Sequence, residues 1–168
     1  INFLMFLSFF FPLIFLVNLS YGNIYYVAKN GKDSNPGTES QPWLTIQKAA
    51  KTLIAGDTVY IKAGTYNEQV VPLNSGEEGK YITYASYSGD SVTIDGAGLQ
   101  IEWSGILYIL NLSHIKISGL KIKNSSDAGI LVEESSYITI EKNYTYNTAS
   151  SGIGVWNSSN IIIDGNEV

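Results

Sequence analysis

The chain has 168 residues, ten lysines, no arginine, no cysteine and a net charge of −5. Acidity without a basic face excludes a nucleic-acid binder, and the lack of cysteine excludes a disulfide framework, a thiol nucleophile and cysteine-ligated zinc. The length allows one domain with a sizeable core, and low charge with abundant Ile, Val, Tyr and Gly predicts many short strands.

Residues 1–22 are predicted to be a secretory signal peptide, possibly truncated at its start. An almost wholly apolar stretch runs from Phe3 to Val17, and Ser20 and Gly22 are the small residues before a cleavage point. A membrane anchor is the alternative, because about 17 apolar residues is the lower limit for a span. We therefore expect a secreted protein, extracellular or at the cell surface, that contacts a membrane only through an uncleaved leader.

Residues 23–80 are predicted to form an N-terminal cap with one amphipathic helix at 45–55. Thr45 can act as the N-cap and Gly56 ends the pattern. A helix in a strand-rich chain would cover the open edge of the first strands. The apolar residues follow helical spacing: Ile46, Ala49, Ala50, Leu53 and Ile54.

Residues 81–168 carry an internal repeat of 23 residues, which predicts stacked coils of short strands. Apolar residues alternate within each unit, as in strands. A second element recurs from Gly129 to Gly152 and is preceded by a 24-residue step from Gly105. The expected fold is a parallel β-solenoid with coils about 4.8 Å apart. Because the pattern continues to Val168, we expect further coils in a longer protein.

The repeat predicts which side chains stack from coil to coil. One interior row would contain Ile94, Ile117, Ile140 and Ile163, and a second would contain Val92, Ile115, Ile138 and Ile161. Asn143 and Asn166, also one period apart, are predicted to point inward and to share amide hydrogen bonds. The alternative is that both are ordinary exposed turn residues.

Two segments carry a family resemblance. YYVAKNGKDSNPGTESQPWLTIQKAAKTLIAGDTVYIKAGTYNEQV at 25–70 and YITYASYSGDSVTIDGAG at 81–98 resemble the N-terminal cap and first coils of extracellular right-handed parallel β-helix proteins. They are similar to the pectate lyase family nine group and to related alginate and chondroitin lyases. The resemblance implies an all-β, right-handed parallel β-helix with a capping α-helix. It is weaker for activity, because fold does not fix function.

The resemblance implies β-elimination on an acidic polysaccharide. Such lyases need calcium to neutralise the uronate carboxylate and a Lys or Arg base to remove the neighbouring proton. In the resembling family these residues lie in later coils, and no aspartate cluster here matches them. No catalytic residue is therefore assigned, and the calcium ligands are expected largely outside this chain.

Three outward columns remain as candidate sites. The first, Asp95, Ser118, Glu141 and Asp164, places Glu141 and Asp164 about 5 Å apart. This pair is either part of a metal site for calcium or an acidic face relieved by Lys116 or Lys142.

The second column contains Lys121, Tyr144 and Glu167 beside Lys123 and Tyr146. Its tyrosines and lysines could hold an acidic sugar chain by stacking and charge, or be ordinary surface pairs. The third column places Glu133 above Trp156, which would face outward as a sugar platform or pack under a loop.

These observations predict a secreted polysaccharide-active β-helix protein, if catalytic a pectate-like lyase, whose partner is an acidic polysaccharide. The alternative is a non-catalytic surface or adhesion module that binds glycans. A metal-handling accessory protein is disfavoured by the single histidine and absent cysteine.

Overall fold

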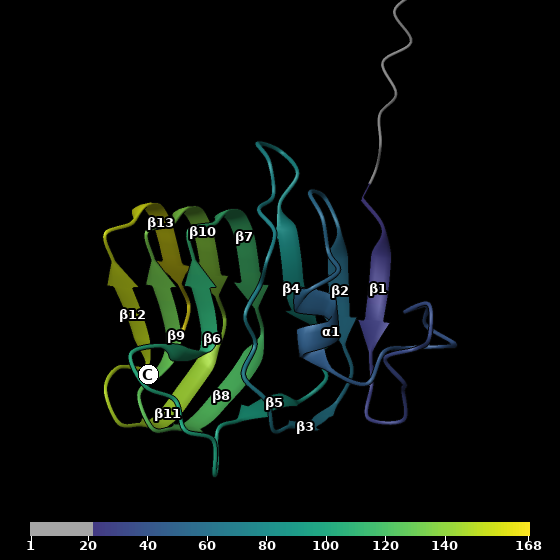
Figure 1. The fold of residues 1–168 in the computed structure, drawn as a ribbon, viewed down its shortest axis with the longest axis horizontal. Coiled ribbons are helices and arrows are strands. Elements are labelled where there is room, and N and C mark those ends of the chain that lie inside the picture. The colour runs from purple at the N-terminus through teal and green to yellow at the C-terminus, as the bar shows by residue number, and fades with distance from the viewer. Residues whose placement is uncertain (1–21) are drawn as a thin grey trace, which may run out of the picture.

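The computed structural model describes residues 22–168, so the predicted leader lies outside the described residues except for Gly22. The chain winds through three sheets of parallel strands stacked along one axis (Figure 1). This arrangement confirms the predicted parallel solenoid. Within the described part, no helix has the length and apolar character needed to cross a membrane.

Sheets A, B and C form the walls of the solenoid. Sheet A contains β1 (Ile24–Val27), β2 (Thr58–Ile61), β4 (Ile82–Ser86), β7 (Ser113–Ser118), β10 (Ser136–Glu141) and β13 (Ser159–Asp164). Sheet B contains β3 (Gly64–Tyr66), β5 (Val92–Asp95), β8 (Leu120–Ser125) and β11 (Tyr144–Thr148). Sheet C contains β6 (Gly105–Leu110), β9 (Ala128–Glu133) and β12 (Ile153–Trp156).

The strand register confirms the 23-residue period in the later coils. Ser113 pairs with Ser136, and Ser136 pairs with Ser159. Sheets B and C repeat the same step between β8 and β11 and between β9 and β12. The 24-residue step expected from Gly105 is wrong, because Gly105 pairs with Ala128, 23 residues later.

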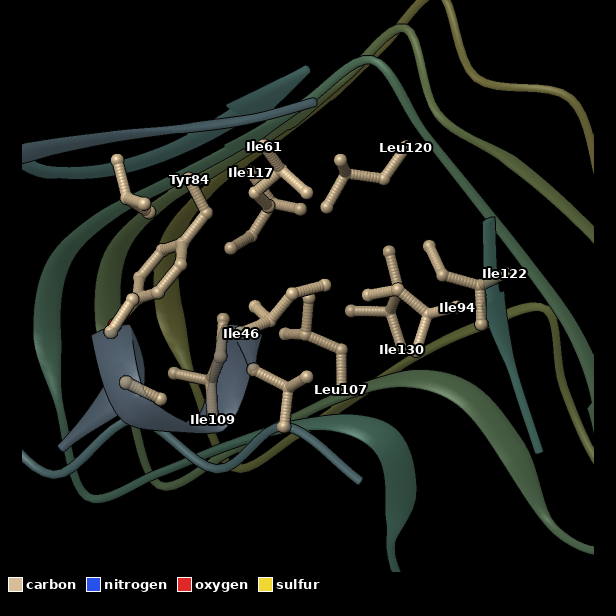
Figure 2. Packing of buried hydrophobic residues seen from close by; sticks show 14 of the residues in the cluster. Ile46, Ile61, Tyr84, Ile94, Leu107, Ile109, Ile117, Leu120, Ile122 and Ile130 are labelled. Atoms are coloured by element: carbon tan, nitrogen blue, oxygen red, sulfur yellow. The ribbon is translucent and has the colours of Figure 1, made fainter. Parts of the chain in front are cut away.

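The first member of one expected interior row is wrong. Ile117, Ile140 and Ile163 stack in sheet A as predicted. Ile94, however, lies in sheet B, where it pairs with Ile122 (Figure 2). The neighbour of Ile117 on the N-terminal side is instead Tyr84.

Val92 is displaced in the same way, since it pairs with Leu120 rather than with Ile115. The cause is a longer coil at this point. Ile82 and its sheet A partner Ile115 are 33 residues apart, ten more than the later period. A strict count of 23 therefore leads from sheet B into sheet A.

The core is a column of aliphatic side chains enclosed by the three sheets. In β7 and β10, Ile115, Ile117, Ile138 and Ile140 are fully buried. Each such side chain contributes about 1.5–3 kcal/mol by leaving water. The row continues to Ile163, which is 50% exposed because β13 is the edge strand of sheet A.

Residues with positive φ mark the corners of each coil. The corner after sheet A is Gly119 at φ 72°, then Lys142 at 55° and Gly165 at 60° in successive coils. The end of sheet B has Asn124 at 58° and Asn147 at 54°. Gly and Asn tolerate this left-handed conformation best, so the corners explain why these residues recur between strands.

The predicted helix is present but shorter than expected. Helix α1 spans Ile46–Ala50 rather than 45–55. Thr45 is the N-cap as predicted, because its hydroxyl accepts a hydrogen bond from the Lys48 amide at 3.1 Å. Helix α1 packs beside β1 at the N-terminal end of the solenoid (Figure 1).

The chain turns after α1 because side chains from elsewhere bind its backbone. The Ile54 amide donates to Asp57 Oδ2 at 3.0 Å, so the helical pattern is not continued. Ile54 is consequently 59% exposed rather than part of the apolar face. At the other end, the Glu68 carboxylate accepts from the Ile46 and Gln47 amides at 3.0 and 2.8 Å.

Candidate functional site

The predicted acidic pair on sheet A is already neutralised in part by a lysine. Glu141 pairs in register with Asp164 as expected. Glu141 Oε1 lies 2.9 Å from Lys116 Nζ and accepts from the Ser118 hydroxyl at 3.1 Å. The hydrogen bond from Lys116 lowers the pKa of the Glu141 carboxyl. This geometry favours the interpretation of an acidic face relieved by Lys116.

A calcium ion at this pair would meet a poor donor set. Calcium takes about six to eight oxygen ligands, whereas no group of three or more metal-binding side chains gathers anywhere in residues 22–168. The Lys116 ammonium also occupies the space beside Glu141. The residues described here therefore do not by themselves fit a calcium site.

Asp95 is misplaced in the predicted acidic column. It lies in sheet B, in register with Lys123 rather than Ser118. The Lys123 ammonium is 3.1 Å from Asp95 Oδ2, and this hydrogen-bonded pair raises the pKa of Lys123. Lys123 is thus held by a neighbour within the sheet.

The predicted tyrosine–lysine surface is present on the outer face of sheet B. Tyr144 pairs with Lys121 and Tyr146 with Lys123, and Glu167 bridges to Tyr144. The two tyrosine rings lie 5.1 Å apart at a tilt of 43°, and each residue is 40% exposed. These side chains form a small aromatic surface with a cation beside it.

Trp156 lies on a different face, the outer face of sheet C. It pairs with Glu133 as predicted and is 70% exposed. Glu133 Oε2 accepts a hydrogen bond of 2.6 Å from the Tyr108 hydroxyl. Burial, together with this bond, raises the pKa of Tyr108 to about 12. The predicted site residues thus divide among three sheets, and only Trp156 borders a large groove.

That groove has a volume of about 780 Å³ and lies on sheet C and the adjoining loops. The sequence analysis did not identify its second aromatic wall, Trp103. The lining also includes the aliphatic Leu131 and three carboxylates, Glu102, Asp127 and Glu133. Aromatic walls with a few polar groups are typical of small-ligand sites.

The loop that carries Trp103 is anchored on both sides of the tryptophan. The Ile101 side chain is buried, and its amide donates to the Ser126 hydroxyl at 2.8 Å. The Ser104 amide donates to Asp127 Oδ2 at 3.2 Å. Trp103 itself has φ 54° and is 91% exposed. A tryptophan held out of the core by a fixed loop is suited to contact a ligand.

One signal in the sequence could have identified this loop. Ile94 and Leu107 are aligned in sheets B and C with Ile122 and Ile130. The connection between the first pair is five residues longer than that between the second. An insertion that carries a tryptophan in a surface loop is a functional signal.

Residues 25–167 match the Pel9A-like, right handed beta helix region. The chain belongs to this family. Its fold is therefore a right-handed parallel β-helix, and it is related to polysaccharide lyases, as the resemblance implied.

Three relatives illustrate this relationship. The uncharacterized protein YwoF of Bacillus subtilis is 37% identical over 133 residues, which cover 73% of this chain and 28% of YwoF. The pectate lyase PEL9 of Emericella nidulans is 28% identical over 153 residues, which cover 82% of this chain and 37% of that enzyme. The chain thus spans well under half the length of these relatives.

The crystal structure of pectate lyase Pel9A gives a TM-score of 0.67 at 20% identity. The match covers 84% of this chain and 38% of that enzyme. At this identity the likeness concerns the fold.

Proposed function

We propose that this chain forms the N-terminal coils of a secreted polysaccharide lyase that cleaves an acidic, pectate-like polysaccharide by β-elimination. The observation that carries this proposal is the groove between Trp103 and Trp156 on a β-helix whose relatives include a pectate lyase. Exposed indole rings can stack on the apolar face of a sugar ring, and the groove is long enough to hold part of a chain.

The chemical step is assigned to coils outside these residues. β-Elimination needs a base near the sugar carbon that loses its proton and a positive charge at the uronate carboxylate. Of the groove-lining residues, none is a lysine, and Lys116 and Lys123 are engaged with acids on sheets A and B. We therefore place the lysine base and the calcium ligands in further coils, and give these coils a binding role.

The tyrosine–lysine surface of sheet B is proposed as a second sugar contact. Tyr144 and Tyr146 offer a partly exposed aromatic surface, and the exposed Lys121 beside Tyr144 supplies a positive charge. This pairing suits a uronate unit, whose carboxylate would meet the ammonium while its ring lies on a tyrosine.

A non-catalytic glycan-binding module is the alternative function. It is favoured by one observation, that the groove combines aromatic walls with acids and has no lysine in its lining. Both functions use the same groove, so turnover distinguishes them.

The test is to incubate the full-length protein with pectate or alginate and calcium, and to follow ultraviolet absorbance of the unsaturated product. Turnover that falls in Trp103→Ala and Trp156→Ala would support the lyase proposal. The matched control is Trp43→Phe, because Trp43 is buried away from the groove. Binding of glycans without turnover on any uronate polymer would establish the module instead.

Secretion has its own test. Protein recovered from the culture medium should begin near Ser20–Gly22 when its N-terminus is sequenced. An intact leader found in the membrane fraction would support the anchor.

A further inference from the structure

We infer that the groove between Trp103 and Trp156 takes an uncharged sugar unit rather than a uronate. This inference rests on the proposed function, because it names the ligand class of the same groove. It concerns the charge of the lining, which the two tryptophans alone do not determine.

The described lining of the groove carries charges of one sign. Glu102, Asp127 and Glu133 contribute three carboxylates, which are ionised at neutral pH. A uronate carboxylate placed among them would be repelled by each, and the lining supplies no ammonium to offset that repulsion. An uncharged sugar meets no such penalty.

The same carboxylates are good partners for sugar hydroxyls. A carboxylate oxygen accepts charge-assisted hydrogen bonds, which are stronger than neutral ones. Glu133 uses one oxygen for Tyr108 and Asp127 uses one for the Ser104 amide. Each retains acceptor capacity, because an ionised carboxylate has about four lone-pair sites.

The aromatic residues complete the complementarity. Trp103 and Trp156 are the most exposed large apolar side chains in the groove, at 91% and 70%. The side chains of Ser126, Ser150 and Ser151 add further small hydrogen-bonding groups along the lining. Stacking with many hydroxyl contacts and no cation is the pattern expected for a neutral pyranose chain.

The test is calorimetric titration of the full chain with two probes, a neutral galacto-oligosaccharide and an oligogalacturonate of equal length. Both titrations are run in EDTA and again with calcium. The neutral probe should bind at least about tenfold more tightly in EDTA, and its affinity should not change with salt. Affinity for the oligogalacturonate should rise as salt screens the repulsion.

Variants assign the effect to the groove. Trp103→Ala and Trp156→Ala should abolish binding of the neutral probe, whereas Tyr144→Ala on sheet B should not. Glu102→Gln, which removes one charge from an exposed loop position, should raise oligogalacturonate affinity about threefold and leave the neutral probe unchanged.

Three results would overturn the inference: tighter binding of oligogalacturonate in EDTA, tighter binding of it once calcium is added, or no binding of the neutral probe. None of these would touch the proposed lyase function, which is decided separately by turnover of the full-length protein on uronate polymers. Absence of turnover, in turn, leaves the ligand class measured here intact.

Discussion

The side-chain amide of Asn143 lies one coil away from that of Asn166 and donates to its Oδ1 at 3.0 Å. Asn143 also accepts from the Leu120 amide at 3.0 Å and donates to the Ile117 carbonyl at 3.1 Å. Asn166 repeats the pattern by donating to the Ile140 carbonyl at 2.8 Å. The predicted inward ladder is thus confirmed, and it satisfies backbone groups at the buried corner between sheets A and B.

Replacing Asn143 by alanine should destabilise the protein by about 2–3 kcal/mol, because buried backbone groups lose their partners. The measurement is urea denaturation followed by circular dichroism. Asn166→Ala is the matched comparison and should cost less, because Asn166 is more exposed than Asn143. Equal costs at the two positions would contradict this role for burial.

Gly119→Ala should destabilise by about 1–2 kcal/mol because its φ of 72° strains any residue with a Cβ atom. The added Cβ would also collide with the Ser86 hydroxyl. The reverse change, Lys142→Gly at the equivalent corner, relieves a φ of 55° and should stabilise by about 0.5 kcal/mol after the entropy of glycine is subtracted. Thermal denaturation of both variants tests the pair, and a destabilised Lys142→Gly would show that the corner is not strained.

Lys116→Met should destabilise the protein at neutral pH by at most about 0.5 kcal/mol, since the pair with Glu141 is partly exposed. The pKa of Glu141 is lower in the folded state than its ordinary value of 4.5. The stabilisation is therefore present above that value and is lost as pH falls through the folded-state pKa.

Denaturation of this variant and the parent at several pH values measures the effect. The control is Lys121→Met, an exposed lysine on the neighbouring sheet, which should show no such pH dependence. A Lys116→Met defect that persists unchanged at pH well below the folded-state pKa would point to lost packing rather than lost charge.

The solenoid could be predicted because stacking makes the sequence periodic. Ile115, Ile138 and Ile161 occupy one position in sheet A, and the 23-residue spacing reports this directly. The assignment of Ile94 failed because strands of all three sheets share the same alternation of apolar residues. Spacing alone cannot tell the sheets apart where a coil is lengthened.

The groove was harder to predict because it depends on which faces meet. Trp156 was expected to face outward and does so. Trp103 lies outside the repeat, so periodicity says nothing about it, and only the fold brings the two residues to one groove. The sheet B and sheet C candidates looked equivalent in sequence, although they lie on different faces.

The central claim is that glycans bind at the groove of sheet C, and the three tryptophans of the chain allow a direct test. Trp43 is an internal reference, because it is 3% exposed and its indole N–H donates to the Asn35 carbonyl at 2.8 Å. In a nuclear magnetic resonance titration with neutral and uronate oligosaccharides, the indole N–H signals of Trp103 and Trp156 should shift while that of Trp43 stays fixed. Unchanged signals for Trp103 and Trp156 at saturating glycan would contradict the claim.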